Sequence, residues 1–310
     1  MDEIRSVLIV GAGAVGSVVA ATIHRARPGS AVLLANAARK ARFQAEGLVI
    51  NGERLELPLV STNEPFARGQ EPGLAIVAVK NHQLPGAIAE MAPLVGAGTL
   101  ILSLMNGIAS EEELAAAFGR QKVLFAMIIG IDAVRELDRT SCTLGGTINF
   151  GEARNIPGKW DDRVRRIASF FDAAGLKYAV PEDMVRTLWY KLMVNVGINQ
   201  ASAVLRAPYS VFQRVAEARR VMDAAMLELV GISRLRGTGL SEEDLTSWYT
   251  TLDSLSPGGK TSMLQDVEAG RKTEVEIFAG TVIALGEESG VPTPVNRLLY
   301  DLIRTIELTR

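Results

Sequence analysis

Cysteine and histidine are scarce in this 310-residue sequence, which contains one cysteine and two histidines. Because Cys142 is alone, the chain cannot form an intrachain disulfide, and it offers no Cys/His spacing typical of a metal site. His24 and His82 are too few for a histidine-based metal centre. These scarcities exclude a disulfide-stapled scaffold and predict a protein that binds no metal.

Long apolar runs and an excess of charge are also missing. Hydrophobic residues make up 48% of the chain, but glycine or charged residues interrupt every run before the ~18 residues that a membrane span needs. The formal net charge of −2 provides no basic surface for nucleic acid or an anionic membrane. The first residues carry acidic side chains and lead directly into a strand pattern, unlike a secretory signal. We therefore expect a cytoplasmic protein with no nucleic-acid or membrane partner.

A glycine-rich motif lies between a short apolar run, Ser6–Val10, and a helical pattern that continues to about Ala26. The motif comprises Gly11, Ala12, Gly13, Ala14, Val15 and Gly16. In this strand-to-helix context Gly11 permits a tight turn, Gly13 lets the backbone approach a pyrophosphate, and Gly16 lets helix and strand pack closely. The pattern predicts a dinucleotide-binding turn, although a purely structural glycine-rich turn would have the same composition.

The end of the second predicted strand, residues 31–35, indicates which dinucleotide is bound. An NAD-binding unit usually has an acidic residue there to hold the ribose hydroxyls, whereas this chain has Asn36, followed by Arg39, Lys40 and Arg42. A 2′-phosphate would be attracted by these cations and would meet no carboxylate, so the pattern favours NADP. The alternative is that the cations only solvate the next helix.

Two further buried strands are predicted at residues 74–79 and 99–104. Each ends in polar residues, with Lys80 and Gln83 after the first and Asn106 after the second. Because ligands bind beyond the carboxyl ends of strands in a doubly wound sheet, these side chains are candidates for cofactor contacts. Ordinary solvated strand ends are the alternative.

Strand and helix patterns alternate up to residue 180, with a small hairpin predicted within residues 48–60, and are almost entirely helical afterwards. We therefore predict an α/β fold, in which a Rossmann-type doubly wound sheet (residues 1–180) is followed by an all-helical domain (residues 181–310). Residues 211–236 and 242–255 are each predicted to form one helix.

The helix predicted for residues 181–208 is apolar except for one stripe. Lys191, Asn195 and Asn199 follow one another at spacings of four, so they lie on one face. Polar groups in an apolar helix need either a polar partner or a pocket. The stripe is therefore a satisfied core network, a solvent-facing row or part of a ligand site. Ser262 and Asp266 share a helical face in the same way.

Two capping-box patterns predict helix starts, one at Ser110–Glu113 and one at Thr273–Glu276. The second would put Glu274 at a helix N-terminus, where a carboxylate also complements the helix dipole without any further role.

The motifs GAGAVG, VAVKNHQ, MNG, WYKLMVNVGIN, TSMLQD and RKTEVE occur together and in this order over nearly the whole chain. In these motifs the sequence resembles the ketopantoate reductase (2-dehydropantoate 2-reductase) family. The resemblance implies an N-terminal Rossmann domain, a helical C-terminal domain, and NADPH and a 2-oxo acid bound in a cleft between them. It also implies reduction of ketopantoate to pantoate on the route to pantothenate and coenzyme A.

By position, the resemblance implies that Lys191 is the general acid and that Glu274 helps to hold the substrate and polarise the site. It implies substrate contacts from Asn195, Asn199 and Ser262. Asn106 would lie near nicotinamide and substrate, and Lys80 and Gln83 beside the cofactor.

The sequence departs from the family pattern in several places, and Asp132 lies in a region where other members differ. Asn36 stands where NADP-dependent members commonly have arginine, Met105 where glutamine or histidine is usual, and Gln200 where proline is common. A reductase of another branched 2-oxo acid is therefore one alternative, and a non-catalytic dinucleotide-sensing protein is a second. The helical domain could also support a homodimer.

Overall fold

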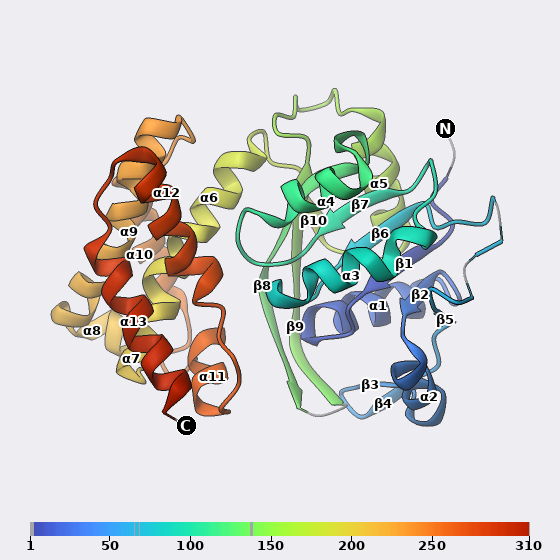
Figure 1. Cartoon of the computed structure of the whole chain (residues 1–310), viewed down its shortest axis with the longest axis horizontal. Coiled ribbons are helices and arrows are strands. Elements are labelled where there is room, and N and C mark those ends of the chain that lie inside the picture. The colour runs from blue at the N-terminus through green and yellow to red at the C-terminus, as the bar shows by residue number, and fades with distance from the viewer. Residues whose placement is uncertain (1–2, 65, 68, 137–138, 310) are drawn as a thin grey trace. The chain divides into compact units, whose positions relative to one another are not determined.

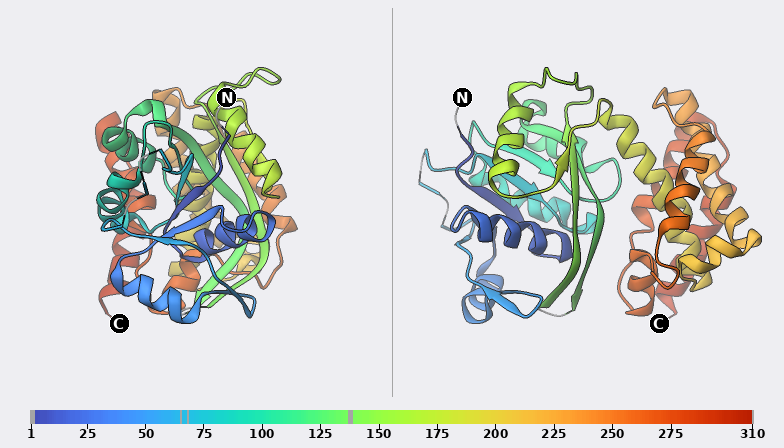
Figure 2. Two further views of the ribbon diagram at one scale, coloured as in Figure 1. Left: turned by 90° about the vertical axis from the view of Figure 1, so that its right-hand side faces the viewer. Right: turned by 180° about the vertical axis from the view of Figure 1, so that it is seen from behind.

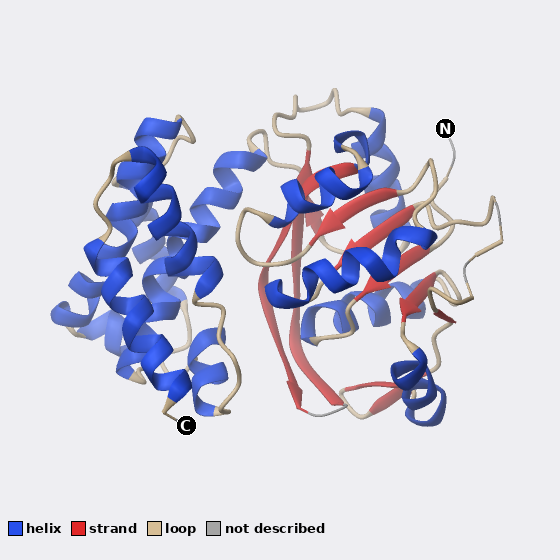
Figure 3. Ribbon diagram, viewed as in Figure 1, coloured by secondary structure: helices blue, strands red, loops and turns tan. Residues whose placement is uncertain are grey.

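The computed structural model describes residues 3–64, 66–67, 69–136 and 139–309 (Figure 1). The chain divides into two compact units between Met184 and Val185, whereas the boundary expected from the sequence is Pro181. The described strands all belong to the first unit, and the second unit is built from helices (Figure 3). The fold is therefore a mixed α/β sheet domain followed by a helical region, as predicted.

The first unit contains a ten-stranded sheet in the order β4-β3-β9-β8-β7-β6-β1-β2-β5, with β10 beside β9. The strands are β1 (Val7–Val10), β2 (Ala31–Leu34), β3 (Leu48–Ile50), β4 (Glu53–Leu55), β5 (Leu59–Val60), β6 (Leu74–Val77), β7 (Leu100–Ser103), β8 (Val123–Glu136), β9 (Arg139–Gly151) and β10 (Tyr178–Ala179). β5, β2, β1, β6, β7 and β8 are parallel to their neighbours in this order. The chain leaves β2 on one side of β1 and returns as β6 on the other side. This reversal is the switch point at which doubly wound sheets bind ligands.

The helices of the first unit cover this sheet. They are α1 (Ala14–Ala26), α2 (Ala37–Glu46), α3 (Leu84–Met91), α4 (Ser110–Phe118) and α5 (Asp162–Ala173), with the short 3₁₀ turns η1 (Asn81–Gln83), η2 (Ala92–Leu94) and η3 (Arg120–Lys122). All four residues of each of β1, β2, β6 and β7 are buried. Continuous apolar runs of this kind are typical of parallel strands covered on both faces. Two separate apolar clusters pack on the sheet, with Ile9 in one and Leu8 in the other.

β8 and β9 form a long antiparallel ribbon with a register shift between Asp132 and Ala133. The sequence predicts a strand at residues 123–129 and strand propensity with hairpin punctuation at residues 132–151, and the ribbon covers both segments. The ribbon packs against α1, as the views in Figure 2 show. The hairpin predicted within residues 48–60 is confirmed: β3 and β4 pair across Asn51 and Gly52, which have φ of 50° and 82°.

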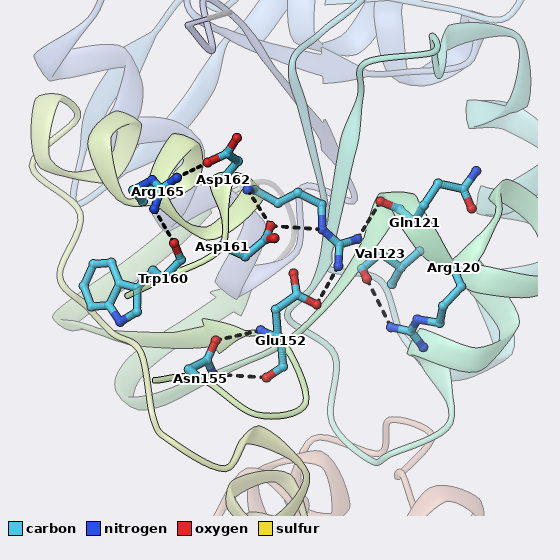
Figure 4. Close-up of polar contacts among 10 residues, drawn as sticks. Arg120, Gln121, Val123, Glu152, Asn155, Trp160, Asp161, Asp162 and Arg165 are labelled. Atoms are coloured by element: carbon cyan, nitrogen blue, oxygen red, sulfur yellow. Dashed lines mark hydrogen bonds and ion pairs between the residues drawn. The ribbon is translucent and has the colours of Figure 1, made fainter. Parts of the chain in front are cut away.

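Ion pairs tie the end of the ribbon to α5 (Figure 4). Arg163 pairs with Glu152 at 2.5 Å and lies 3.6 Å from Asp161, whose side chain caps α5 by accepting from the Arg163 N–H. Asn155 accepts from the Glu152 N–H at 3.0 Å. The network fixes the segment that leads from the sheet toward the helical unit.

The helical unit contains α6 (Met184–Val194), η4 (Asn195–Asn199), α7 (Gln200–Leu205), α8 (Tyr209–Arg214), α9 (Ala216–Arg236), α10 (Glu243–Ser254), α11 (Ser262–Glu268), η5 (Glu276–Gly280), α12 (Thr281–Ser289) and α13 (Pro294–Leu308). Here η4 and η5 are π-helical turns. No helix among the described residues is long and apolar enough to cross a membrane.

The helix predicted for residues 181–208 is confirmed as one continuous helical run that ends at Leu205, but it is not regular throughout. It begins at Met184 and changes to a π-helical turn over Asn195–Asn199. Gly197, in the middle of this turn, packs so closely on α9 that a Cβ would lie 2.6 Å from Met226 Cγ. The Gln200 side chain donates to the Val196 carbonyl at 2.7 Å, which satisfies a group of the widened turn.

The single helix predicted for residues 211–236 is wrong, because the structure has two helices there, α8 and α9. Val215 is extended, with φ −103° and ψ 111°, and separates α8 from α9. Valine is a poor helix former, and the Arg219 guanidinium donates to the Phe212 carbonyl at 3.0 Å near the break.

The helix start predicted at Ser110–Glu113 is confirmed, since α4 begins at Ser110, but its N-cap is Ala109 and not Ser110. The Ser110 hydroxyl lies 2.7 Å from the Ser103 hydroxyl instead. The helical turn η5 begins at Glu276, after the start predicted at Thr273. The Thr273 hydroxyl accepts from the Val275 N–H at 3.3 Å and also donates to Glu307 on α13 at 2.7 Å.

Candidate active site

The glycine-rich turn has a geometry that fits a dinucleotide pyrophosphate. Gly11 has φ of 100°, and a Cβ there would lie 2.6 Å from the Ala78 carbonyl oxygen, just beyond β6. A Cβ on Gly16 would lie 1.9 Å from the Gly11 carbonyl oxygen. Gly13 differs, since the nearest atom to its Cβ would be 3.9 Å away. The space beside Gly13 is open, and Gly13 starts α1 without a side-chain cap, which are the features that a bound phosphate requires.

The two strand-end segments follow the neighbouring strands β6 and β7. Lys80 begins η1, and its N–H donates to Gln83 Oε1 at 3.1 Å. Asn106 is half-buried in the turn after β7, before Gly107 with φ of 94°. Because β6 is next to β1 and β7 is next to β6, these turns lie at the same edge as the glycine-rich turn. The three predicted cofactor segments of the first unit thus share the carboxyl edge of the parallel strands.

The cations predicted to select NADP have carboxylate or aromatic partners. Asn36 caps α2 by accepting from the Arg39 N–H at 3.0 Å. The Arg39 guanidinium pairs with Glu90 on α3 at 2.9 Å, and both side chains are partly exposed. Lys40 pairs with Glu64, and Arg42 lies over the Phe43 ring. A carboxylate, that of Glu90, therefore lies beside the predicted phosphate ligand Arg39, which the sequence pattern did not reveal.

In the helical unit, three predicted substrate residues form one hydrogen-bonded chain. Asn199 donates from Nδ2 to Asn195 Oδ1 at 2.9 Å, and Ser262 donates from Oγ to Asn199 Oδ1 at 3.3 Å. Asn199 is 5% exposed and Asn195 is half-buried. The chain of bonds fixes the Asn195 Oδ1 as an acceptor, so its amide N–H groups are the donor end. Thr261, which caps α11 by accepting from the Leu264 N–H, holds Ser262 at the helix start.

Lys191 lies on α6 one turn before Asn195, and its side chain is half-buried. Glu274 lies in the bend before η5 and is also half-buried, with its carbonyl accepting from the N–H of Ile277 at 3.1 Å. η4 begins one turn after Lys191 and η5 begins two residues after Glu274, and these two π-helical turns pack against each other within the helical unit. Such turns frequently occur at functional sites.

Two residues that the sequence patterns did not identify, Glu111 and Arg135, have surroundings that make them candidates for a role near the site. Glu111 on α4 is 2% exposed, and burial raises its pKa to about 7, against the opposing effects of hydrogen bonds and of Arg120. Arg135 on β8 donates to the Ala12 carbonyl of the glycine-rich turn and to Ser17 Oγ at 3.1 Å. Neither could be found by motif, since Glu111 matched a capping pattern and Arg135 depends on the ribbon reaching back to α1.

No group of three or more histidine, cysteine or acidic side chains that could hold a metal occurs in the part of the chain that the structure describes. The open parallel sheet, with its glycine-rich turn at the switch point, defines the class of dinucleotide-binding α/β proteins.

Comparison with known proteins identifies the family. Residues 7–155 match the model described as Ketopantoate reductase PanE/ApbA, and residues 183–307 match the model of its C-terminal part. The chain belongs to the ketopantoate reductase family, a family of oxidoreductases. A 2-dehydropantoate 2-reductase of Archaeoglobus fulgidus is 29% identical over 98% of this chain and 99% of its own.

Solved structures with the same fold include D-mandelate dehydrogenase with NADH and anilino(oxo)acetate, at a TM-score of 0.87 and 21% identity over 98% of both chains. A dimeric ketopantoate reductase from Staphylococcus aureus has a TM-score of 0.80 and 20% identity, over 98% of this chain and 99% of its own.

Proposed function

We propose that this protein reduces 2-dehydropantoate to pantoate with NADPH, on the route to pantothenate and coenzyme A. The observation that carries the proposal is the polar row of the helical unit. Lys191 is followed one turn later by the hydrogen-bonded chain of Asn195, Asn199 and Ser262. An apolar helix bundle has no need of such a row for its packing, whereas a hydroxylated oxo acid needs donors and acceptors in fixed positions.

The residues perform distinct parts of the reaction. Bound NADPH supplies the hydride that reduces the carbonyl carbon. Negative charge then develops on the carbonyl oxygen, where protonated Lys191 Nζ stabilises it and donates its proton. Glu274 favours the charged form of Lys191 against desolvation. Asn195, Asn199 and Ser262 bind the hydroxyl and carboxylate oxygens of the substrate and thereby orient its carbonyl.

For the cofactor, we propose that the dinucleotide pyrophosphate binds at the N-terminus of α1, with Gly11 to Gly16 around it. Lys80, Gln83 and Asn106 are proposed to contact the cofactor at the ends of β6 and β7. The preference for NADPH is supported by Asn36 in place of an acid and by the Arg39 cation. The ion pair of Arg39 with Glu90 opposes that preference, because it adds a carboxylate beside the phosphate ligand.

A panel of 2-oxo acids assayed with NADPH and with NADH tests the proposal. We expect the highest kcat/KM with 2-dehydropantoate and NADPH. If a different branched or aromatic oxo acid gave the highest kcat/KM, it would replace 2-dehydropantoate as the proposed substrate, and the proposed type of reaction would stay the same. Cofactor binding without turnover on any oxo acid would favour the dinucleotide-sensing alternative.

A second candidate substrate class is that of other branched 2-oxo acids. Its ground is that Met105, buried directly before Asn106, and the fully buried Gln200, directly after Asn199, differ from the residues that are usual in the family. Phenylglyoxylate in the panel adds an aromatic side chain to the comparison.

We also propose a homodimer. Leu298 and Leu302, one turn apart on α13, are 59% and 39% exposed. Exposed apolar residues at helical spacing on one element are typical of a surface covered by another subunit. Light scattering after size-exclusion chromatography gives the mass directly, and a monomer at micromolar concentration would contradict the dimer.

A further inference from the structure

Glu111 is a buried acid to which the proposed reaction gives no role. It lies in the first turn of α4 and is 2% exposed, although an ionised carboxylate is costly to bury. Its neighbour in the chain, Glu112, is exposed and pairs with Arg120 at 3.0 Å. A buried carboxyl of this kind persists only where hydrogen bonds compensate its desolvation, so its partners indicate what it does.

The Glu111 carboxyl has backbone hydrogen bonds at Glu111 and Ala126, and a further bond begins a chain that ends at the turn carrying Asn106. Ser110 donates from Oγ to Glu111 Oε2 at 3.1 Å. Ser103, the last residue of β7, lies 2.7 Å from Ser110, oxygen to oxygen. The Met105 N–H donates to Ser103 Oγ at 3.3 Å. All three side chains are buried, with exposures of 0% for Ser103, 4% for Ser110 and 2% for Glu111.

The chain has a fixed direction when Glu111 is ionised. A carboxylate only accepts, so Ser110 must give its single proton to Glu111. Ser103 must then give its proton to Ser110, which leaves the Ser103 oxygen to accept the Met105 N–H. Every group has one arrangement, and the charge at the end strengthens the bonds. A protonated carboxyl is a weaker acceptor and adds a competing O–H donor, so the direction is no longer fixed.

The backbone leaves the sheet at this point. The Leu104 N–H pairs with the Val77 carbonyl of β6 at 2.8 Å. After Met105 the chain turns through Asn106 and Gly107, whose φ is 94°. The bond from the Met105 N–H to Ser103 holds the peptide that directly precedes Asn106.

We propose that Glu111 is a positioning residue, which fixes the turn bearing Asn106 through a one-way hydrogen-bond chain that ends on its carboxylate. The inference rests on the proposed function, in which Asn106 contacts nicotinamide and substrate. Glu111 itself contacts neither.

The surroundings of Glu111 predict a pH dependence. Burial raises the pKa of Glu111 to about 7, so its ionisation falls within the working pH range. The elements packed on α4 are β7, β8, η3 and α3. β7 and residues 123–127 of β8 have no titratable side chain. η3 contributes Arg120 and also Lys122, whose Nζ donates to the Gly96 carbonyl. α3 contributes Glu90, which pairs with Arg39. On α4 itself, Glu112 and Glu113 are exposed.

The first test measures kcat/KM for the best oxo acid of the panel against pH. For a group that titrates near 7, the ionised fraction rises about tenfold from about pH 6 to about pH 8. We expect wild-type kcat/KM to rise severalfold over this range, and Glu111→Gln to stay flat near the low-pH value. Ser110→Ala, which keeps the acid but breaks the chain, should also lose the rise. Glu113→Gln, on the same helix but exposed, should follow the wild type.

The second test needs no turnover. The backbone amide signals of Met105 and Asn106 in the NMR spectrum of the full chain should shift with pH, with a midpoint near 7, and should stop doing so in Glu111→Gln and Ser110→Ala. If no oxo acid is reduced by the wild type, the proposed function fails while this measurement still decides on Glu111. The inference is overturned if Glu111→Gln keeps the wild-type pH profile, or if these amide signals titrate equally in the variant.

Discussion

At the residue scale, the proposed chemistry depends on one ammonium group and on the amides beside it. Lys191 lies on the same face as Asn195 in the last turn of α6, and the Asn195–Asn199–Ser262 bonds order the groups that follow. Water easily satisfies the hydrogen-bonding groups of asparagine side chains. The linkage of two asparagines into a chain within a helix bundle therefore indicates a surface that recognises polar atoms. The lysine supplies the only proton that the reduction requires.

Replacing Lys191 by alanine should separate chemistry from cofactor binding. We expect turnover to fall by about 10²–10⁴-fold, the range for loss of a general acid, with the Kd for NADPH changed by less than about twofold. Stopped-flow turnover and fluorescence titration with NADPH measure the two quantities. Lys177→Ala, at an exposed position in the first unit, is the control. Near-normal turnover of Lys191→Ala would refute the assignment.

The Arg39–Glu90 pair predicts a change in cofactor preference. Glu90→Gln frees the Arg39 guanidinium and removes a charge that repels a 2′-phosphate. Because a surface ion pair contributes about 1 kcal/mol or less, the ratio of kcat/KM for NADPH to that for NADH should rise by at most about fivefold. Arg39→Ala should lower the same ratio. Glu53→Gln, which breaks the exposed pair with Arg25, should leave the ratio unchanged; an equal change there would show that the effect is general electrostatics.

At the scale of single elements, the regular parts of the fold could be predicted and the irregular parts could not. β1, β2, β6 and β7 are buried on both faces, so their apolar runs carry a strong signal, and the glycine-rich turn carries its own steric requirement. The π-helical turn at Asn195–Asn199 has no such signal, because it depends on Met226 packing over Gly197. Ser110 matches a capping pattern, but its hydroxyl bonds to Ser103, and the Thr273 hydroxyl accepts the Val275 N–H while it also donates to Glu307. Of the predicted site, the linkage of Asn195, Asn199 and Ser262 is present, whereas Glu111 and Glu90 become visible only in three dimensions.

The π-helical turn should be sensitive to the size of residue 197. A Cβ on Gly197 would lie 2.3 Å from Met226 Cε and 3.0 Å from Met222 Cγ, so Gly197→Ala overpacks the contact between η4 and α9. We expect the free energy of unfolding to decrease by about 1–3 kcal/mol, measured by urea denaturation. Gly231→Ala on α9 is the matched control. Its Cβ would meet only Val291 Cγ1 at 3.7 Å, so helix propensity should stabilise that variant by roughly 0.5–1 kcal/mol. Equal stability of the two variants would contradict the packing argument.

At the scale of the whole molecule, each unit has its own proposed task. The first carries the dinucleotide-binding turn at the switch point of its sheet, and the second carries the polar row. A bound cofactor should therefore stabilise the protein through the first unit by mass action alone.

Among the glycines of the turn, Gly13 allows the stabilisation by bound cofactor to be tested without loss of the fold. Gly13 has φ of −74° and open space around it, so Gly13→Ala should fold normally but obstruct the pyrophosphate. NADPH at about 100 times its Kd should stabilise the wild type by about 2.7 kcal/mol, and Gly13→Ala should show most of this gain lost at the same concentration. Differential scanning calorimetry with and without NADPH measures both. Stabilisation of Gly13→Ala equal to that of the wild type would contradict a pyrophosphate at α1.

The two outermost strands of the sheet bear on how the molecule avoids aggregation. β5 has two residues and β4 has three, of which Glu53 and Arg54 are exposed. Both edge strands are short and β4 is charged, so they present few unpaired main-chain groups with which another chain could pair. The protein can therefore keep a broad ten-stranded sheet in a crowded cell without offering a template on which fibrils could grow.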